Sequence, residues 1–426
     1  VCNNGNKAGG VTGSGSPVGD PFDIDYVAHE MGHQFGCNHT QNNNCNRNGA
    51  TAMEPGSAST IMGYAGICAP NVQSNSDDHF HGVSLEEISI EILSGGHTCE
   101  VLTPLSNSAP VILSTNGNIT VPANTPFALT AIATDADGDP ISYNWEQMNN
   151  NVSTQPPVAT STTGPNFRSN SSVPEPTRYF PNLTALAAGG PFTWEVLPSV
   201  SRTMNFRVTI RDNAIGGGCN DHEDVTLTTH AASGPFIVTY PSATGIVWAG
   251  ATTETVTWDV ANTNNAPVSC TSVDILLSTD GGATYPTVLA SGVPNDGSQA
   301  ITVPNTATTT ARVMVISSTG TFFDISNNNF TITCGTTQTP VFNAIPVACQ
   351  NDAAFSLPST SDNGISGSWT PALNLTVPGS FTYNFNPAAN QCANVVSTQL
   401  TVQPQVEPVF IHPTSICQND VFILPT

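Results

Sequence analysis

The sequence predicts a multidomain protein in which a short α+β segment is followed by a series of all-β sandwiches. Its 426 residues exceed what one ordinary domain needs. Apolar residues recur with helical spacing in the first part of the chain and alternate with a period of two from about residue 108. Near the end, the pattern at 340–352 recurs at 408–420, which indicates a tandem repeat.

These changes of pattern divide the chain into five parts. Short runs of β-branched and aromatic residues at 111–113, 119–121, 127–130 and 141–145, separated by turn residues, predict strands of a sandwich. We expect an N-terminal segment over 1–104, a sandwich over 105–233 with a Pro-, Ser- and Thr-rich insertion at about 150–185, a second sandwich over 234–336, an immunoglobulin-like repeat over 337–404 and a truncated second repeat over 405–426.

Composition indicates an extracellular protein that binds neither nucleic acid nor anionic membrane. Acidic residues number 31 against 8 basic ones, and a net charge of -23 repels both of those partners. Eleven cysteines indicate an oxidising compartment. No apolar run is long enough for a transmembrane helix. We therefore expect a secreted or cell-surface location.

The two ends of the sequence indicate a piece of a longer protein. It starts at Val1, without an initiator Met or a signal peptide, and stops within the second repeat. We expect an internal fragment.

The stretch 29–39 carries three histidines and a glutamate at the spacing of metal ligands. His29 and His33 are four residues apart, so on a helix both rings face one point, with Glu30 beside them. Gly36 can take a left-handed conformation, end the helix and return His39 to that point. Three protein ligands leave one zinc position open to water, as in catalytic sites.

The helix that bears these residues should begin at Asp20 and Pro21, with Asp20 as its N-cap. Val27, Met31 and Phe35 are four residues apart, so we expect them to bury one face while the histidines occupy another.

The pattern HExxHxxGxxH, followed by Ser59 to Tyr64 around Met62, resembles the metzincin metallopeptidases with their Met-turn. The surrounding stretches 25–28, 53–57 and 63–68 are similar to the reprolysin-like secreted peptidases of Bacteroidetes-type bacteria. The resemblance implies the C-terminal lobe of an α+β metzincin catalytic domain. It also implies zinc on His29, His33 and His39, and protein or peptide substrates.

The same resemblance implies roles around the metal. Glu30 acts as the general base on the zinc-bound water, and Met62 forms an apolar floor. Tyr64 matches a tyrosine that stabilises the oxyanion in astacin-like and serralysin-like relatives, a role that reprolysin-like members commonly lack. Both roles, catalysis and packing, stay open for Tyr64.

Metzincins also have an upper lobe before the zinc helix, and only 28 residues precede His29. We therefore expect the parent protein to be a zinc endopeptidase and this fragment to be weakly active or inactive.

Three features follow the motif. A disulfide among Cys37, Cys45 and Cys68 should close the loop after the helix; Cys37 as a metal ligand is the alternative. Ser84 to Glu87 form a capping box that should open a helix through about Leu93. Beyond this helix, Cys99 is expected to pair with another cysteine, such as Cys2.

Two other polar clusters have alternative interpretations. Residues 77–81, with two aspartates and two histidines, are a second metal site or a polar surface loop. Asp135, Asp137 and Asp139 resemble the acidic turns of cadherin-like modules and are a calcium site or a solvated turn. An EF-hand is excluded because Pro140 takes the place of its glycine.

The later modules give further expectations. In the second sandwich, Trp258 should lie in the core, 273–277 should form a strand that turns at 280–282, and Cys270 could bridge to Cys334. In the repeat, Cys349 and Cys392 can pair, which leaves Cys417 alone. The repeats resemble the immunoglobulin-like stalks of bacterial surface proteins, which implies contact with a cell surface or extracellular matrix.

Two functions follow from these features. The first is a secreted zinc-dependent endopeptidase with Glu30 as general base. The alternative is a non-enzymatic surface or adhesion protein in which the protease segment is vestigial. No GxSxG and no GxxxxGK occurs, which disfavours a serine hydrolase and a phosphate-binding loop.

Overall fold

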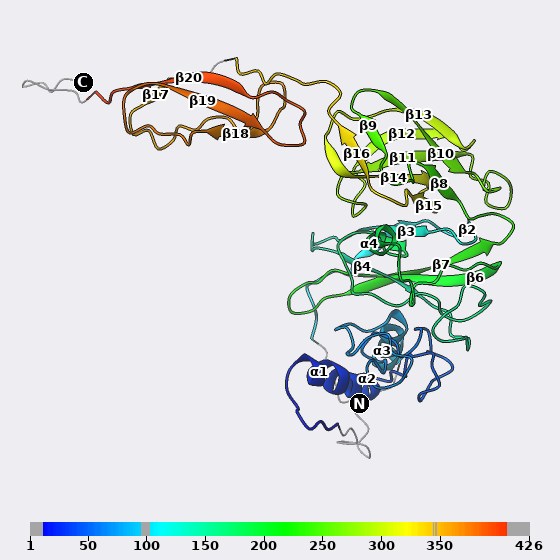
Figure 1. Cartoon of the computed structure of the whole chain (residues 1–426). Coiled ribbons are helices and arrows are strands. Elements are labelled where there is room, and N and C mark those ends of the chain that lie inside the picture. Colours follow the sequence, from blue (N-terminus) through cyan, green and yellow to red (C-terminus); the bar gives the residue numbers. More distant parts are fainter. Residues whose placement is uncertain (1–11, 95–102, 344, 346, 407–426) are drawn as a thin grey trace, which may run out of the picture. The chain divides into compact units, whose positions relative to one another are not determined.

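A computed structural model describes residues 12–94, 103–343, 345 and 347–406. Helices dominate the beginning of this part and strands the rest (Figure 1), so the predicted fold class is confirmed. The chain divides into two compact units. The first comprises Val1–Val247, Thr253–Thr302 and Thr309–Thr331, and the second comprises Trp248–Thr252, Val303–Thr308 and Ile332–Thr426. Most of the predicted second repeat, with Cys417, lies outside the described residues.

The first helical stretch is built of three consecutive pieces. These are α1 (Asp20–Phe22), a π-helix (Asp23–Ala28) and α2 (His29–Gln34). The predicted start is displaced by one residue, because Gly19 with φ 74° takes the N-cap position and Asp20 is already helical. Asp20 as a side-chain cap was therefore wrong.

The predicted buried face of this helix was also wrong. Met31 is 51% exposed, and Val27 and Phe35 are only partly buried. The π-helical turns have i→i+5 hydrogen bonds, so they shift the face that a regular α-helix would present. Ile24 and Ala28 pack instead against the core of the segment.

Helix α3 (Gly82–Ser94) begins two residues before the predicted capping box. Ser84 is therefore inside the helix, and its buried hydroxyl has no hydrogen-bond partner among the described residues. The first amides are satisfied differently: Gly82 N donates to Glu146 Oε2 at 2.7 Å and Val83 N to His81 Nδ1 at 3.1 Å. The capping box was wrong because tertiary partners supply the cap.

The first sandwich consists of two antiparallel-rich sheets, β1-β3-β5 and β2-β7-β6-β4. The predicted strands are present, and the insertion itself contributes β5 and the start of α4. The elements are β1 (Val111–Thr115), β2 (Ile119–Pro122), β3 (Phe127–Thr134), β4 (Ser142–Gln147), β5 (Thr177–Phe180), α4 (Leu183–Ala188), β6 (Arg202–Arg211) and β7 (Asn220–His230).

Aromatic rings fill the space between these sheets. Phe127, Phe167, Phe180 and Phe206 are buried, and ring centroids in this group lie 4.7 to 6.0 Å apart. Trp145 from β4 is also buried, with 2% of its surface exposed. Strand β4 pairs along its length with β6, which carries Phe206, and β4 also carries Glu146.

The second sandwich contains sheets β13-β10-β8 and β12-β11-β14, with β15 paired to β14. Trp258 is 4% exposed, as predicted, and donates to Asn295 Oδ1. The division between the units falls within β9 (Val247–Ala249) and β16 (Phe330–Thr333), and after the first residue of β14. The other strands are β8 (Ile237–Tyr240), β10 (Thr253–Asp259), β11 (Ser272–Ser278), β12 (Thr287–Pro294), β13 (Ser298–Thr302), β14 (Thr308–Ser317) and β15 (Phe323–Ile325).

The second unit contains a four-stranded sheet in the order β17-β20-β19-β18. Its core includes Tyr383 and Leu400. The strands are β17 (Ala348–Cys349), β18 (Gly367–Thr370), β19 (Gly379–Pro387) and β20 (Val396–Gln403).

The predicted pairings of Cys270 with Cys334 and of Cys349 with Cys392 were both wrong. Cys334 pairs with Cys392. Gln338 N donates to Cys392 O at 2.9 Å, and this brings the segment after Cys334 alongside Cys392. Cys270 and Cys349 are free thiols. In the described part of the chain, no helix is both long and apolar enough to cross a membrane.

Candidate metal centre

The three histidines of the motif converge on one point. Helix α2 places His29 and His33 on one face, and their Nε2 atoms are 3.1 Å apart. His39 Nε2 is also 3.1 Å from His33 Nε2. Tetrahedral ligands about 2.0–2.1 Å from a zinc ion would lie about 3.3 Å from one another, close to this spacing. The ring nitrogens are therefore arranged as a ligand set.

Gly36 makes this convergence possible. Its φ is 89°, in the left-handed region that glycine adopts at low cost. The helix ends there, and Cys37 N donates back to Gly32 O at 3.0 Å. The chain then reverses and returns His39 to the helix face, as the sequence predicted.

Each histidine is oriented by a backbone carbonyl. The Nδ1 atom of His29 lies 2.7 Å from Ile61 O, that of His33 2.7 Å from Cys37 O, and that of His39 3.0 Å from Asn46 O. A carbonyl only accepts, so each Nδ1 carries the proton and each neutral ring has its lone pair on Nε2. The lone pair of His33 Nε2 thus lies 3.1 Å from both of the others, an arrangement that a cation between the three nitrogens would stabilise.

Electrostatics keep the rings ready to bind a cation. Burial lowers the pKa of His29 and of His39, although the backbone hydrogen bonds and the charge of Glu30 act in the opposite direction. Neutral imidazole is the form that binds metal. Glu30 directly follows His29 in helix α2, and its charge opposes the effect of burial on the pKa of both rings.

Met62 and its neighbours form the floor of the segment. Met62 is fully buried in a cluster with Cys37 and Ile61. A Cβ on Gly32 would come within 2.4 Å of Met62 Sδ, so the helix approaches the methionine as closely as glycine allows. That Met62 lies beneath a bound zinc stays a prediction, and the role of Gly32 was not predicted.

Tyr64 packs against the ligand rings. Its ring centroid is 4.5 Å from that of His39 and 5.7 Å from that of His29. Its hydroxyl accepts a hydrogen bond from Asn46 Nδ2 at 3.1 Å. Asn46 thus supports both His39 and Tyr64, a contribution that no sequence signal indicated.

The cysteines near the motif are structural. Cys45 and Cys68 form a disulfide, which agrees with one of the predicted pairings. Cys37 is buried, its thiol donates to Ser84 O at 3.4 Å, and burial with the charge of Glu87 raises its pKa to about 12. A protonated thiol in an apolar cluster is a poor metal ligand. Cys2 and Cys99 lie outside the described residues.

The other candidate metal sites differ from this centre. Among the described residues, only Asp135, Asp137 and Asp139 form another converging group. Asp135 Oδ1 already accepts from Asp137 N at 2.8 Å and Asp139 N at 3.1 Å, which closes the turn.

His79 and His81 belong to no such converging group. Both rings face the carboxylate of Glu146 instead.

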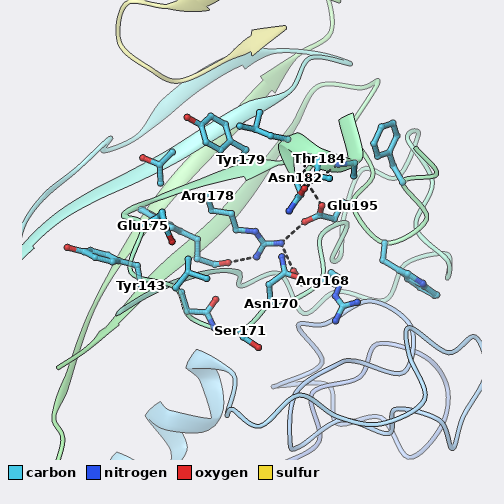
Figure 2. Close-up of a pocket in the computed structure, with 18 of the residues that line it drawn as sticks. Tyr143, Arg168, Asn170, Ser171, Glu175, Arg178, Tyr179, Asn182, Thr184 and Glu195 are labelled. Carbon is cyan, nitrogen blue, oxygen red and sulfur yellow. Dashed lines mark hydrogen bonds and ion pairs between the residues drawn. The ribbon is translucent and has the colours of Figure 1, made fainter. Parts of the chain in front are cut away.

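A separate cavity of about 810 Å³ lies in the first sandwich (Figure 2) and is lined by none of the three histidines. Figure 2 shows Arg178 between Glu195 and Asn170. Arg178 Nη2 is 2.7 Å from Glu195 Oε1 and donates to Arg168 O at 2.7 Å. Glu195 Oε2 accepts from Asn182 N at 3.1 Å. These charges neutralise each other and brace the insertion.

Comparison with known proteins is consistent with these observations. The family model of the reprolysin-like M12B metallopeptidases matches residues 1–90. No curated protein sequence matches the chain.

Solved structures similar to this chain include three sets of β modules. The fibronectin(III)-like modules of CbhA from Clostridium thermocellum share 11% identity over 53% of this chain and 93% of theirs, with a TM-score of 0.18. The tandem Ig repeats of Drosophila Dlar share 14% identity over 53% of this chain and 97% of theirs, with a TM-score of 0.27. Drosophila N-cadherin EC1-4 shares 12% identity over 71% of this chain and 76% of its own, with a TM-score of 0.19.

Proposed function

We propose that this chain carries the zinc centre of a secreted endopeptidase that hydrolyses proteins or peptides. His29, His33 and His39 would hold the ion. The observation that carries the proposal is the convergence of three Nε2 atoms, with His33 Nε2 3.1 Å from each of the other two and a backbone carbonyl at every Nδ1. The match of residues 1–90 to a metallopeptidase family supports it.

The chemistry follows from the residues around this point. A zinc ion held there would acidify a bound water and polarise a substrate carbonyl. Glu30 would accept the proton of that water and return it to the leaving amine. The hydrogen bonds to Ile61 O, Cys37 O and Asn46 O would keep the rings from turning, which is the orienting role of groups behind metal ligands.

The partners and the location are part of the same proposal. The Cys45–Cys68 and Cys334–Cys392 disulfides support an oxidising, extracellular compartment. The strand-rich modules after residue 110 would contact a cell surface or matrix. The alternative function, a surface or adhesion protein with a vestigial protease segment, is favoured by the share of the chain that these modules occupy.

Zinc content and proteolysis separate the two functions. The 426-residue chain and its Glu30→Gln, His33→Ala and His222→Ala variants would be dialysed against zinc and assayed with casein. We expect one zinc per chain except in His33→Ala, and a loss of at least about 100-fold in cleavage for Glu30→Gln. The exposed His222 serves as the control. Absence of bound zinc in the wild type would refute the centre. Bound zinc together with measurable cleavage that Glu30→Gln leaves unchanged would reject Glu30 as general base and favour the adhesion function.

A calcium site and a solvated turn stay alternative predictions for Asp135, Asp137 and Asp139. Burial and the neighbouring carboxylates Asp135, Asp212 and Asp137 raise the pKa of Asp139, as expected where like charges gather. Because Asp135 already closes the turn, we expect a calcium chelator to leave the melting temperature of the chain unchanged. A fall that added calcium reverses would establish the site.

A further inference from the structure

We propose that Glu146, on strand β4 of the first sandwich, is a positioning residue for the ligand His29. This inference rests on the zinc centre proposed above. It assigns the first sandwich a part in that centre that its sequence does not suggest, because Glu146 is 116 positions beyond Glu30 in the chain and lies in a different predicted module.

Glu146 is a fully buried carboxylate with contacts to the zinc-binding segment. Its Oε2 accepts a hydrogen bond from Gly82 N at 2.7 Å. Its Oε1 accepts from the hydroxyl of Ser169 and is 3.9 Å from Nε2 of both His79 and His81. Burying a carboxylate costs free energy unless such partners compensate, so this residue fixes their positions.

The charges around the carboxylate agree with this role. Burial raises the pKa of Glu146, but the electrostatic influence of His81 and His79, the hydroxyl of Ser169 and the charge of Arg211 lower it overall. Both carboxylate oxygens accept hydrogen bonds, as the oxygens of an ionised carboxylate do. An ionised acceptor binds Gly82 N, at the N-terminus of the 13-residue helix α3, more strongly than a neutral one.

The contact reaches His29 through the Met-turn. Ser169 Oγ donates to Glu146, so it accepts from His79 Nε2, 3.0 Å away. The backbone carbonyl of His79 accepts from Ile61 N at 3.1 Å. The carbonyl of Ile61 in turn accepts from His29 Nδ1 at 2.7 Å. Glu146 and the metal ligand are thus joined by four consecutive contacts.

Ser169 also contacts Ser59, the first residue of the Met-turn stretch. The carbonyl of Ser169 accepts a hydrogen bond from Ser59 Oγ at 3.0 Å. Displacement of Ser169 or His79 would therefore move both ends of the stretch 59–61. Because Ile61 O is the acceptor for His29 Nδ1, such a displacement would rotate the His29 ring.

A second branch runs through helix α3 to His39. Glu146 caps the helix at Gly82. One turn further, Glu87 accepts from Asn38 N at 2.9 Å and from Asn38 Nδ2 at 2.6 Å. Asn38 directly precedes His39. The position of α3 consequently sets the approach of the third ligand, and Glu146 fixes one end of α3.

The test compares two substitutions of Glu146 with a matched substitution elsewhere in the same sandwich. Glu146→Ala removes every acceptor, whereas Glu146→Gln keeps an oxygen for Gly82 N. Asp212→Asn is the control: Asp212 is also fully buried and accepts backbone amides from Ala214 and Cys219. Zinc affinity by chelator competition, the visible spectrum of the cobalt-substituted chain and the melting temperature would be measured for each.

We expect Glu146→Ala to weaken zinc binding about tenfold or more and to change the cobalt spectrum, the range known for groups behind metal ligands. Glu146→Gln should recover most of the affinity. Asp212→Asn should lower the melting temperature while leaving affinity and spectrum as in the wild type. Equal zinc affinity in Glu146→Ala and wild type, or equal losses in Glu146→Ala and Asp212→Asn, would overturn the inference.

Two provisions keep the test decisive. If Glu146→Ala does not fold, Ser169→Ala removes only the hydroxyl between Glu146 and His79. A loss of about threefold or more in zinc affinity would then support the inference, and unchanged affinity would reject it. If the wild type itself binds no zinc, it is the proposed zinc centre that fails. Tight wild-type binding with unaffected Glu146 variants rejects only the positioning role.

Discussion

At the residue scale, the spacing of His29, His33 and His39 was enough to predict their convergence. Helical geometry brings residues four apart to one face, and a single glycine returns the third ligand. The groups behind the ligands could not be predicted in this way. Ile61 O, Cys37 O and Asn46 O are backbone atoms, which every residue has, so their position depends on the tertiary fold.

Gly32 gives the first prediction at this scale. A Cβ there would lie 2.4 Å from Met62 Sδ and 3.0 Å from Phe80 Cε1, both in the core of the segment. Overpacking should outweigh the better helix propensity of alanine, so Gly32→Ala should lower the free energy of unfolding by about 1–2 kcal/mol. Urea unfolding measures the change. Gly49→Ala is the control, because its Cβ would meet only Arg47 Nη1 at 3.6 Å. Equal stability of both variants would contradict the tight approach.

Tyr64 gives the second prediction. Its ring packs on His39 and its hydroxyl is engaged by Asn46, so we expect a packing role. Tyr64→Phe should then keep zinc affinity and reduce casein cleavage less than about threefold. A loss of about 100-fold in kcat with unchanged KM would instead assign the hydroxyl to oxyanion stabilisation, the size expected for one lost donor.

At the element scale, local patterns predicted the existence of elements better than their ends. Strands β1 to β4 and β11 occur where alternation placed them. The π-helix and the cap of α3 were not predicted. The sequence around Ser84 fits a capping box, but His81 and Glu146 reach the helix amides first. The predicted pairings of Cys270 with Cys334 and of Cys349 with Cys392 failed for a similar reason, since each module was assumed to close on itself.

Strand β15 gives a prediction on pH. Burial raises the pKa of Asp324 to about 7, against the pull of the backbone amides of Val238 and Ile325. Between about pH 4 and 7 the folded chain keeps a proton that the unfolded chain releases, so the free energy of unfolding falls as pH rises through this window. Asp324→Asn should remove this pH dependence. At pH 8 its free energy of unfolding should exceed that of the wild type by about 1–2 kcal/mol, a figure that is reduced because Asp324 is partly exposed.

Urea unfolding between pH 5 and pH 8 measures the effect. Asp296→Asn, at an exposed position in the same sandwich, should retain the wild-type slope. A slope in Asp324→Asn equal to that of the wild type would exclude a protonated Asp324.

At the scale of the whole molecule, the two sandwiches of the first unit share a core. Phe323 N donates to Pro126 O at 2.9 Å, and Ala128, Met314, Phe323 and Ile325 form one buried cluster. The sequence predicted the modules separately, because patterning within a strand carries no information about which neighbouring module covers it. The same limit hid the contact of Glu146 with the zinc-binding segment.

The division into two units predicts two separate unfolding transitions. If only the folded first unit binds zinc, added zinc should raise the temperature of one transition by mass action. The Cys334–Cys392 disulfide closes a loop of sequence separation 58 within the second unit, which should contribute about 4 kcal/mol there by restricting its unfolded state. In calorimetry, the double variant Cys334→Ser and Cys392→Ser should therefore have a lower temperature only for the transition that zinc does not affect. Cys349→Ser, at an exposed free thiol, should leave both in place. A single transition that responds to both zinc and the disulfide would mean that the units unfold as one.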